Sequence, residues 1–129
     1  MSQMLVPLHF LAVGVGAAAG AWLRWLLGLK FNVSGWPWGT LAANLGGGYL
    51  IGLILGLITL HPEWPAWVRL ALVTGFLGGL TTFSTFSAEV VQYLERGQFG
   101  HAAGYAVVSL AGSLCLTALG LATAHLMGR

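Results

Sequence analysis

The third apolar segment of this chain contains the stretch Thr74-Gly75-Phe76-Leu77-Gly78-Gly79-Leu80-Thr81-Thr82-Phe83-Ser84-Thr85-Phe86-Ser87. Adjacent glycines disfavour a helix interior, and hydroxyl groups at bilayer depth need hydrogen-bond partners or water. Phe83 and Phe86 are three residues apart and share one face of a helix among these hydroxyls. The stretch therefore predicts a helix that is broken in mid-membrane. Such breaks present backbone groups, hydroxyls and aromatic edges, and ion sites are commonly built from them.

The composition of the chain identifies the surroundings of this stretch as a membrane. Apolar residues make up 57% and charged residues 6% of the 129 residues, whereas charged residues make up roughly 25% of soluble domains. Four segments reach the roughly 20 residues that a membrane-spanning helix needs, and they cover residues 5–29, 38–60, 66–93 and 99–127. We therefore expect an all-α membrane protein in which residues 1–129 form a single four-helix transmembrane domain.

The few charged and reactive residues exclude several classes of protein. Five Lys and Arg residues against three acids form no basic face of the kind that nucleic acid requires. Cys115 is the only cysteine, so the chain has no intrachain disulfide, and the cysteine offers no cluster for a metal. The first residues lack the basic region of a cleavable signal, although the small residues at 16–20 leave cleavage there as an alternative.

The distribution of the cations bears on the orientation in the membrane. With four spans, Arg69 and Arg129 lie on one side, whereas Lys30 and Arg96 lie on the other side with Arg24 nearby. Such an even division gives almost no preferred orientation under the positive-inside rule. Two interpretations follow. The chain inserts both ways and forms an antiparallel dimer, with the symmetry of inverted-repeat transporters, or one marginal charge fixes a single orientation.

Small residues recur at a spacing of four in three of the predicted helices. These stripes consist of Gly16 and Gly20, of Gly48, Gly52 and Gly56, and of Gly75 and Gly79. Glycine stripes allow membrane helices to approach closely. They fit packing within one subunit as well as packing between subunits, so they do not decide the oligomeric state.

Two polar residues stand out in the first and second spans. Asn44 lies a short way into its span and is followed by three glycines. Its amide offers two donors and one acceptor, all of which need partners in hydrocarbon. It either joins two helices or lines a polar pathway. Arg24 lies close to the end of its span, where it serves as a topology anchor or as a cation that attracts anions to a pore mouth.

The fourth span carries a stripe of hydroxyl groups. Its members follow one another at steps of four residues, which places them along one helical face: Tyr105, Ser109, Ser113 and Thr117. A single serine would bond back to its own helix, but four hydroxyls in register suggest a polar track. These donors, Asn44, Arg24 and the positive ring edges of Phe83 and Phe86 favour an anion. Carbonyls freed at Gly78 and Gly79 would instead suit a dehydrated cation such as sodium.

Glu89 provides the main alternative to an anion pathway. If buried in its span, this carboxylate would tend to be protonated or paired, and such groups run proton-coupled export. If it lies near the membrane boundary, it is an ordinary solvated residue. The alternative function is therefore a proton-coupled small dual-topology exporter that uses Glu89. A third class is a non-transporting membrane subunit, for which the chain offers no soluble interaction surface.

Three stretches together resemble the Fluc (CrcB) family of fluoride channels, and the resemblance extends over the whole chain. Residues 78–87 (GGLTTFSTFS) are similar to the central motif of that family. Residues 39–47 (GTLAANLGG) resemble its second-helix motif, and residues 16–24 (GAAAGAWLR) resemble its first-helix signature. The string TTFSTF is the specific part, whereas the glycine–arginine pattern alone would be weak.

This resemblance implies a passive channel that exports toxic fluoride across the plasma (inner) membrane of a bacterium. It implies an antiparallel dual-topology homodimer in the lipid bilayer, with two pores lined by both subunits and a structural sodium ion at the dimer centre. Asn44 would donate to fluoride, and Phe83 and Phe86 would offer ring edges. Tyr105, Ser109 and Ser113 would form the polar track. The carbonyls of Gly78 and Thr81 would hold sodium, and Arg24 would lie at the aqueous vestibule.

Overall fold

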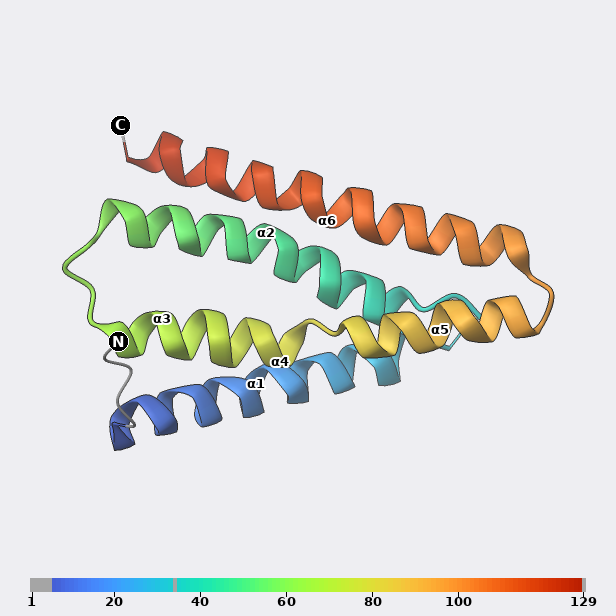
Figure 1. The fold of residues 1–129 in the computed structure, drawn as a ribbon, viewed down its shortest axis with the longest axis horizontal. Coiled ribbons are helices and arrows are strands. Elements are labelled where there is room, and N and C mark those ends of the chain that lie inside the picture. The colour runs from blue at the N-terminus through green and yellow to red at the C-terminus, as the bar shows by residue number, and fades with distance from the viewer. Residues whose placement is uncertain (1–5, 34, 129) are drawn as a thin grey trace.

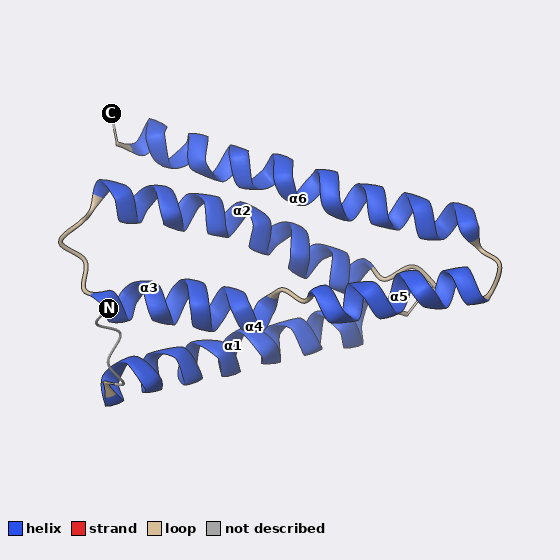
Figure 2. Ribbon diagram, in the orientation of Figure 1, coloured by secondary structure: helices blue, strands red, loops and turns tan. Residues whose placement is uncertain are grey.

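The computed structural model describes residues 6–33 and 35–128, and every regular element in them is a helix (Figures 1 and 2). The elements are α1 (Pro7–Phe31), α2 (Trp38–Leu60), α3 (Ala66–Arg69), the π-helix η1 (Leu70–Leu77), α4 (Gly78–Leu80), α5 (Phe83–Glu95) and α6 (Phe99–Met127). Elements α3 to α5 follow one another as one segment, so the chain crosses the length of the bundle four times (Figure 1).

The prediction of four membrane-length apolar helices is confirmed. The helices cover Pro7–Phe31, Trp38–Leu60, Ala66–Glu95 and Phe99–Met127, against the predicted ranges 5–29, 38–60, 66–93 and 99–127. Position 5, where the first predicted range begins, lies outside the described residues. Pro7 opens α1 because a proline at the first helical position needs no hydrogen-bond acceptor for its nitrogen. Gly97 has a φ of 73° in the turn before α6, a conformation that side chains disfavour.

The helices pack in two pairs, α1 with η1 and α4, and α2 with α6 (Figure 1). In the first pair the backbones meet at a glycine seam, by which we mean Gly16, Gly20, Gly75 and Gly79. A Cβ on Gly75 would lie 2.7 Å from the carbonyl oxygen of Val13, and one on Gly79 would lie 3.0 Å from the amide nitrogen of Ala21. The glycine stripes therefore serve packing within the subunit, which is one of the two readings left open by the sequence.

The second pair is built in the same way. A Cβ on Gly52 would lie 3.0 Å from the amide nitrogen of Leu121, and one on Gly120 would lie 2.6 Å from the amide nitrogen of Leu53. Glycines on both helices thus face the backbone of the other helix. Large apolar side chains are left outside these seams, and many of them are exposed, including Phe10, Trp22, Leu110 and Leu114. Such an apolar exterior fits a chain that is surrounded by lipid.

The third segment changes its backbone at Thr81 and Thr82. Thr81 (φ −89°, ψ 152°) and Thr82 (φ −150°, ψ 117°) are extended, and we call this pair the Thr81–Thr82 linker. The opening that the sequence placed at Gly78–Gly79 is not there, because both glycines lie inside α4. Their missing side chains serve another purpose, since Gly79 gives room to the backbone of α1. Close packing thus outweighs the poor helix propensity of glycine.

Candidate functional site

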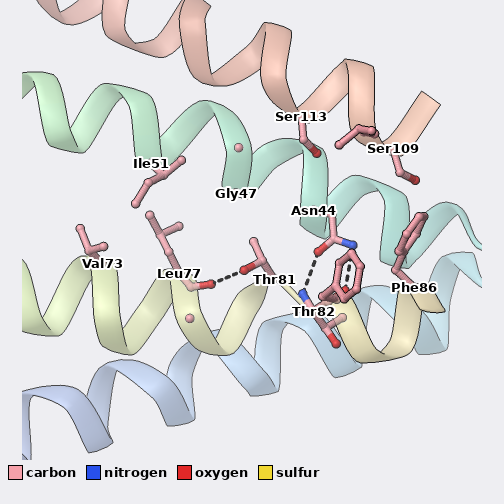
Figure 3. Close-up of a pocket in the computed structure, with 14 residues that line it drawn as sticks. Asn44, Gly47, Ile51, Val73, Leu77, Thr81, Thr82, Phe86, Ser109 and Ser113 are labelled. Carbon is pink, nitrogen blue, oxygen red and sulfur yellow. Dashed lines mark hydrogen bonds between the residues drawn. The ribbon is translucent and has the colours of Figure 1, made fainter. Parts of the chain in front are cut away.

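A cavity of about 460 Å³ opens beside the Thr81–Thr82 linker. Figure 3 shows it between the third segment and the helices α2 and α6. Among the residues that line it are most of the site residues predicted from the sequence: Asn44, Gly78, Thr81, Phe83, Phe86, Ser109 and Ser113. Arg24 and Tyr105 are not among its lining residues. The fold therefore gathers residues from three helices, up to 69 positions apart in the sequence, at one place.

Asn44 on α2 holds the linker through both atoms of its amide. Its Oδ1 accepts a hydrogen bond of 2.8 Å from the backbone N–H of Thr82, and its Nδ2 donates to the carbonyl oxygen of Thr82 at 3.2 Å (Figure 3). These contacts join two helices, as one of the two interpretations of Asn44 expected. Because the amide has two N–H donors, the other donor remains for the cavity that Asn44 lines. The interpretation of Asn44 as a residue of a polar pathway stays a prediction, which its place in the cavity lining supports.

The linker diverts two backbone donors away from helical carbonyls. In an uninterrupted α-helix the N–H of Thr82 would donate to Gly78, and that of Thr85 would donate to Thr81. Here the N–H of Thr82 donates to Asn44, and that of Thr85 donates to the side chain of Thr82 at 3.1 Å. The carbonyls of Gly78 and Thr81 thus lose the helical partners that an unbroken helix would supply.

The side chain of Thr81 also holds the linker in place. Its Oγ1 donates to the carbonyl oxygen of Leu77 at 2.8 Å (Figure 3). Its methyl group occupies the space beside Gly47, where a Cβ on that glycine would overlap Thr81 Cγ2. Gly47 is therefore required by the shape of the linker rather than by the conformation of α2.

Arg24 contacts the segment just before the linker. Its Nε donates to the carbonyl oxygen of Gly79 at 3.0 Å. A carbonyl in the last turn of a helix lacks its usual intrahelical donor, so a guanidinium group stabilises it well. The arginine thus joins the C-terminal half of α1 to α4, and the structure gives it a contact that neither sequence interpretation included.

The two phenylalanines that line the cavity lie beside each other. Their ring centroids are 5.6 Å apart with planes inclined by 47°. The ring of Phe86 also packs against Tyr105, with centroids 5.3 Å apart, whereas Phe83 is 78% exposed. One ring is therefore anchored in the bundle, and the other lies on the outer surface of the subunit.

Two of the four hydroxyl groups in the stripe on α6 line the cavity, and the two at the ends of the stripe do not. Ser109 and Ser113 line the cavity, and the buried Oγ of Ser109 has no hydrogen-bond partner among the described residues. At one end of the stripe, Thr117 donates to the carbonyl oxygens of Gly48 and Ser113, at 2.8 and 2.9 Å. Tyr105 at the other end is fully buried. An unpaired buried hydroxyl is costly, so Ser109 is the member that most needs a partner in the cavity.

A second polar cluster lies around Glu89. Its Oε1 accepts from the hydroxyl of Tyr105 at 2.7 Å, and its Oε2 accepts from Thr40 Oγ1 at 3.1 Å. Asn32 Nδ2 donates to Thr40 Oγ1 at 3.1 Å. Glu89 also lines a cavity of about 160 Å³ with Arg96. The carboxylate is thus paired by hydroxyl donors and reaches an open pocket, a combination of the two situations foreseen for it.

Thr40 and Asn32 are site residues that the sequence analysis missed. Thr40 belongs to the stretch at residues 39–47 that resembles a family motif, which was a usable signal for it. Asn32 offered no such signal, because its role arises from the fold. Its Oδ1 accepts from the backbone N–H groups of Gly39 at 2.6 Å and of Thr40 at 3.3 Å. It therefore caps the first turn of α2 from outside that helix.

Comparison with known proteins places this geometry in context. The family described as "CrcB-like protein, Camphor Resistance (CrcB)" matches residues 11–121. Among similar proteins are three named "Fluoride-specific ion channel FluC". The protein of Bordetella bronchiseptica is 71% identical, over 95% of this chain and 96% of its own. Those of Bordetella petrii and Cupriavidus taiwanensis are 69% and 58% identical, over 97% and 94% of this chain and 98% of each relative.

Proposed function

This chain belongs to the CrcB family, and from that premise we propose that it is a fluoride-selective ion channel that exports toxic fluoride passively from the cytoplasm. The proposal draws on the close relatives that are named fluoride-specific channels. Such a protein is a channel and not an enzyme. Its place would be the plasma (inner) membrane of a bacterium, which the chain would cross several times.

The observation that carries the proposal is the donor set of the cavity beside the linker. The second N–H of Asn44, the hydroxyls of Ser109 and Ser113, and the ring edges of Phe83 and Phe86 belong to residues that line it. A permeating anion must exchange its water shell for protein donors and must still be able to leave. Neutral donors and positive ring edges meet this requirement for a small anion without a fixed positive charge in the cavity.

We also propose that the working unit is an antiparallel homodimer with dual topology and two pores. Within one subunit the cavity lies on an open face, with Phe83 largely exposed and Gly78 exposed. An inverted copy against this face would close the cavity and would contribute to its lining. The even division of the cations between the two sides supports insertion in both orientations. Lipid would cover the remaining apolar surface.

The residues at the linker also fit the sodium ion that the family resemblance implies. Among the described residues, no three His, Cys, Asp or Glu side chains lie close enough to hold a metal. The carbonyls of Gly78 and Thr81, whose helical donors are diverted, are the type of ligand that replaces the water shell of an alkali cation. We propose that these carbonyls hold sodium at the dimer centre. When bound, the ion would supply positive charge that keeps the two linkers in place.

Arg24 and Tyr105 would act at the edges of this arrangement. We assign Arg24 to the aqueous vestibule, where its guanidinium would attract anions while its Nε stays on Gly79. Tyr105 would continue the polar track outward from Ser109 through its contact with Glu89. The same contact is the observation that favours the alternative, a proton-coupled exporter that uses Glu89. Fluoride flux that does not respond to a proton gradient would argue against that alternative.

Fluoride efflux from loaded liposomes tests the proposal, with Asn44→Asp as the decisive variant. The carboxylate keeps an acceptor for the N–H of Thr82 but cannot donate to its carbonyl, and it places negative charge on the anion path. We expect fluoride efflux to fall at least about a hundredfold, since a change of roughly 3 kcal/mol in a barrier has that effect.

The matched control is Gln98→Glu, which makes the same amide-to-carboxylate change just before α6 and away from the cavity. It should conduct as the wild type does, and chloride should not pass through either protein. Undiminished fluoride efflux through Asn44→Asp, with the variant eluting as the wild type does in size-exclusion chromatography, would refute the role of Asn44. Equal efflux of chloride and fluoride through the wild type would refute selectivity.

A further inference from the structure

A third cavity, of about 600 Å³, lies at one end of the bundle and belongs to neither polar site described above. The residues that line it come from the beginning of α1, the end of α2, the following link and the beginning of the third segment, and these helix ends lie at the same end of the bundle (Figure 1). Its volume is within the range of about 300–1,000 Å³ typical of ligand pockets. Because three helix ends meet there, the cavity would lie at the membrane boundary rather than in the hydrocarbon core.

Arg69 and His9 are the groups of this cavity that are left to meet a ligand. The imidazole of His61 also lines the cavity but already has partners. Its Nδ1 lies 3.3 Å from Glu63 Oε2, and the ring stacks on Trp64 with centroids 4.9 Å apart. Within residues 6–33 and 35–128 this is the only contact of salt-bridge length between a basic and an acidic side chain, so Arg69 has no acidic partner there. The cavity thus has positive charge on one wall and a rigid aromatic wall beside it.

The remaining walls are apolar and continue into a lipid-facing surface. Val6, Ile58 and Leu70 line the cavity, and the neighbouring side chains Leu8 and Leu11 on α1 are exposed. Trp64 and Trp67 are partly exposed at the same end, as rings of the aromatic belt at the headgroup level commonly are. A ligand of this cavity therefore needs both a negative head and an apolar body.

We propose that this cavity binds the phosphate of an anionic phospholipid, held by Arg69 and His9, with the acyl chains lying along α1. A guanidinium matches the oxygens of a phosphate with two parallel hydrogen bonds, and basic pockets between transmembrane helices are known sites for anionic headgroups. A zwitterionic lipid brings its own cation near Arg69 and binds less well. The site does not depend on the proposed fluoride pathway, since none of its residues lines the cavity beside the linker.

Native mass spectrometry of the purified full chain tests this proposal. The protein is released from detergent that contains phosphatidylglycerol and phosphatidylcholine in equal amounts. We expect the wild type to retain phosphatidylglycerol preferentially. Arg69→Gln should retain it at least about tenfold less, because the loss of only one of the two charge-assisted hydrogen bonds, at about 1.4 kcal/mol, already corresponds to that factor. His9→Gln should have a smaller effect and serves if Arg69→Gln fails to fold.

The matched control is Lys30→Gln, which removes one exposed cation at the opposite end of the bundle. It should retain phosphatidylglycerol as the wild type does. Equal retention of the two lipids, or an equal loss in Lys30→Gln and Arg69→Gln, would overturn the proposal. A further arm adds inorganic phosphate: displacement of the lipid at matched concentration would show a site for soluble phosphate and would overturn the assignment to lipid. Fluoride efflux of Arg69→Gln, measured separately, shows whether conduction is independent of this site.

Discussion

The glycine seam between α1 and the third segment lies next to the Thr81–Thr82 linker, and the two regions are held in opposite ways. At the seam, backbone meets backbone with no side chain between, as the 2.7 Å approach of a Cβ on Gly20 to the amide nitrogen of Leu80 illustrates. At the linker, side chains satisfy the backbone, since Asn44 bonds both polar groups of Thr82. The same motif therefore contains glycines in close backbone contact with α1 and, directly after them, a linker whose backbone is hydrogen-bonded by a side chain.

This difference separates stability from function along the chain. The seam depends on the absence of atoms, so an added methyl group there has nowhere to go. The linker depends on the presence of particular donors and acceptors, whose loss leaves groups unpaired in an apolar surrounding. Substitutions in the seam should therefore affect folding first, and substitutions at the linker should affect conduction or the local structure.

The largest effect is expected for Gly20→Ala in the seam. The new Cβ would meet the backbone of Phe76 in η1 and of Leu80 in α4, and neither of these can move without shifting the helix to which it belongs. We expect a loss of about 3 kcal/mol in stability, at the upper end of overpacking costs. Size-exclusion chromatography after stepwise heating in detergent measures it as a lower temperature of aggregation.

Gly14→Ala is the matched control on the same helix. A Cβ on Gly14 meets nothing within 4 Å, so this variant should be as stable as the wild type or slightly more stable, since alanine favours the helix. If the two variants lose stability equally, then the close approach of the two backbones is not what requires glycine at position 20. The contrast between seam and linker would then fail.

An intermediate effect is expected for Gly47→Ala, where the added methyl meets a side chain instead of a backbone. Its Cβ would overlap Thr81 Cγ2, and we expect a loss of about 2 kcal/mol together with reduced fluoride efflux. Thr81→Ser removes that methyl but keeps the hydroxyl that donates to Leu77. The double variant should therefore recover most of the stability and efflux that Gly47→Ala loses.

The double-mutant cycle gives this prediction a clear failure. Contacting residues couple by about 0.5–3 kcal/mol, whereas independent sites add. If the losses of Gly47→Ala and Thr81→Ser simply add in the double variant, the methyl of Thr81 does not occupy the space beside Gly47. Aggregation temperature and efflux are measured on the same preparations, so that a change in folding is not mistaken for a change in conduction.

The helices of this fold were predictable because the bilayer sets their length. Apolar runs of the required length leave little choice, and the ranges 38–60 and 99–127 coincide with α2 and α6. The position of the extended residues was not predictable from propensity. Gly78 and Gly79 are poor helix formers, yet they are helical because α1 packs against Gly79. The linker forms at two threonines because Asn44, 38 positions away, supplies the partners for Thr82.

The candidate site was predictable where a polar group interrupts an apolar helix. Asn44, Ser109 and Ser113 stand out in this way, and all three line one cavity. Contacts between distant segments could not be read from the pattern. Glu89 and Thr40 are 49 positions apart and meet through one hydrogen bond, and Asn32 joins them only because α2 begins beside it. The unpaired hydroxyl of Ser109 likewise became visible only once its surroundings were known.

The smallest effect is expected for Thr82→Val at the linker, and it tests which part of Thr82 matters. The side chain of Thr82 caps α5 by accepting from the N–H of Thr85, whereas Asn44 bonds only its backbone. Valine has the same shape and no hydroxyl, so the cap is lost at a cost of about 1 kcal/mol while the bonds to Asn44 remain.

Thr82→Ser keeps the cap and should match the wild type in aggregation temperature. A decrease in Thr82→Ser together with an unchanged Thr82→Val would show that the methyl group, and not the cap, stabilises the linker. A loss of fluoride efflux in Thr82→Val as large as that in Asn44→Asp would show that the hydroxyl itself belongs to the anion path, because the backbone contacts that shape the cavity are the same in the valine variant.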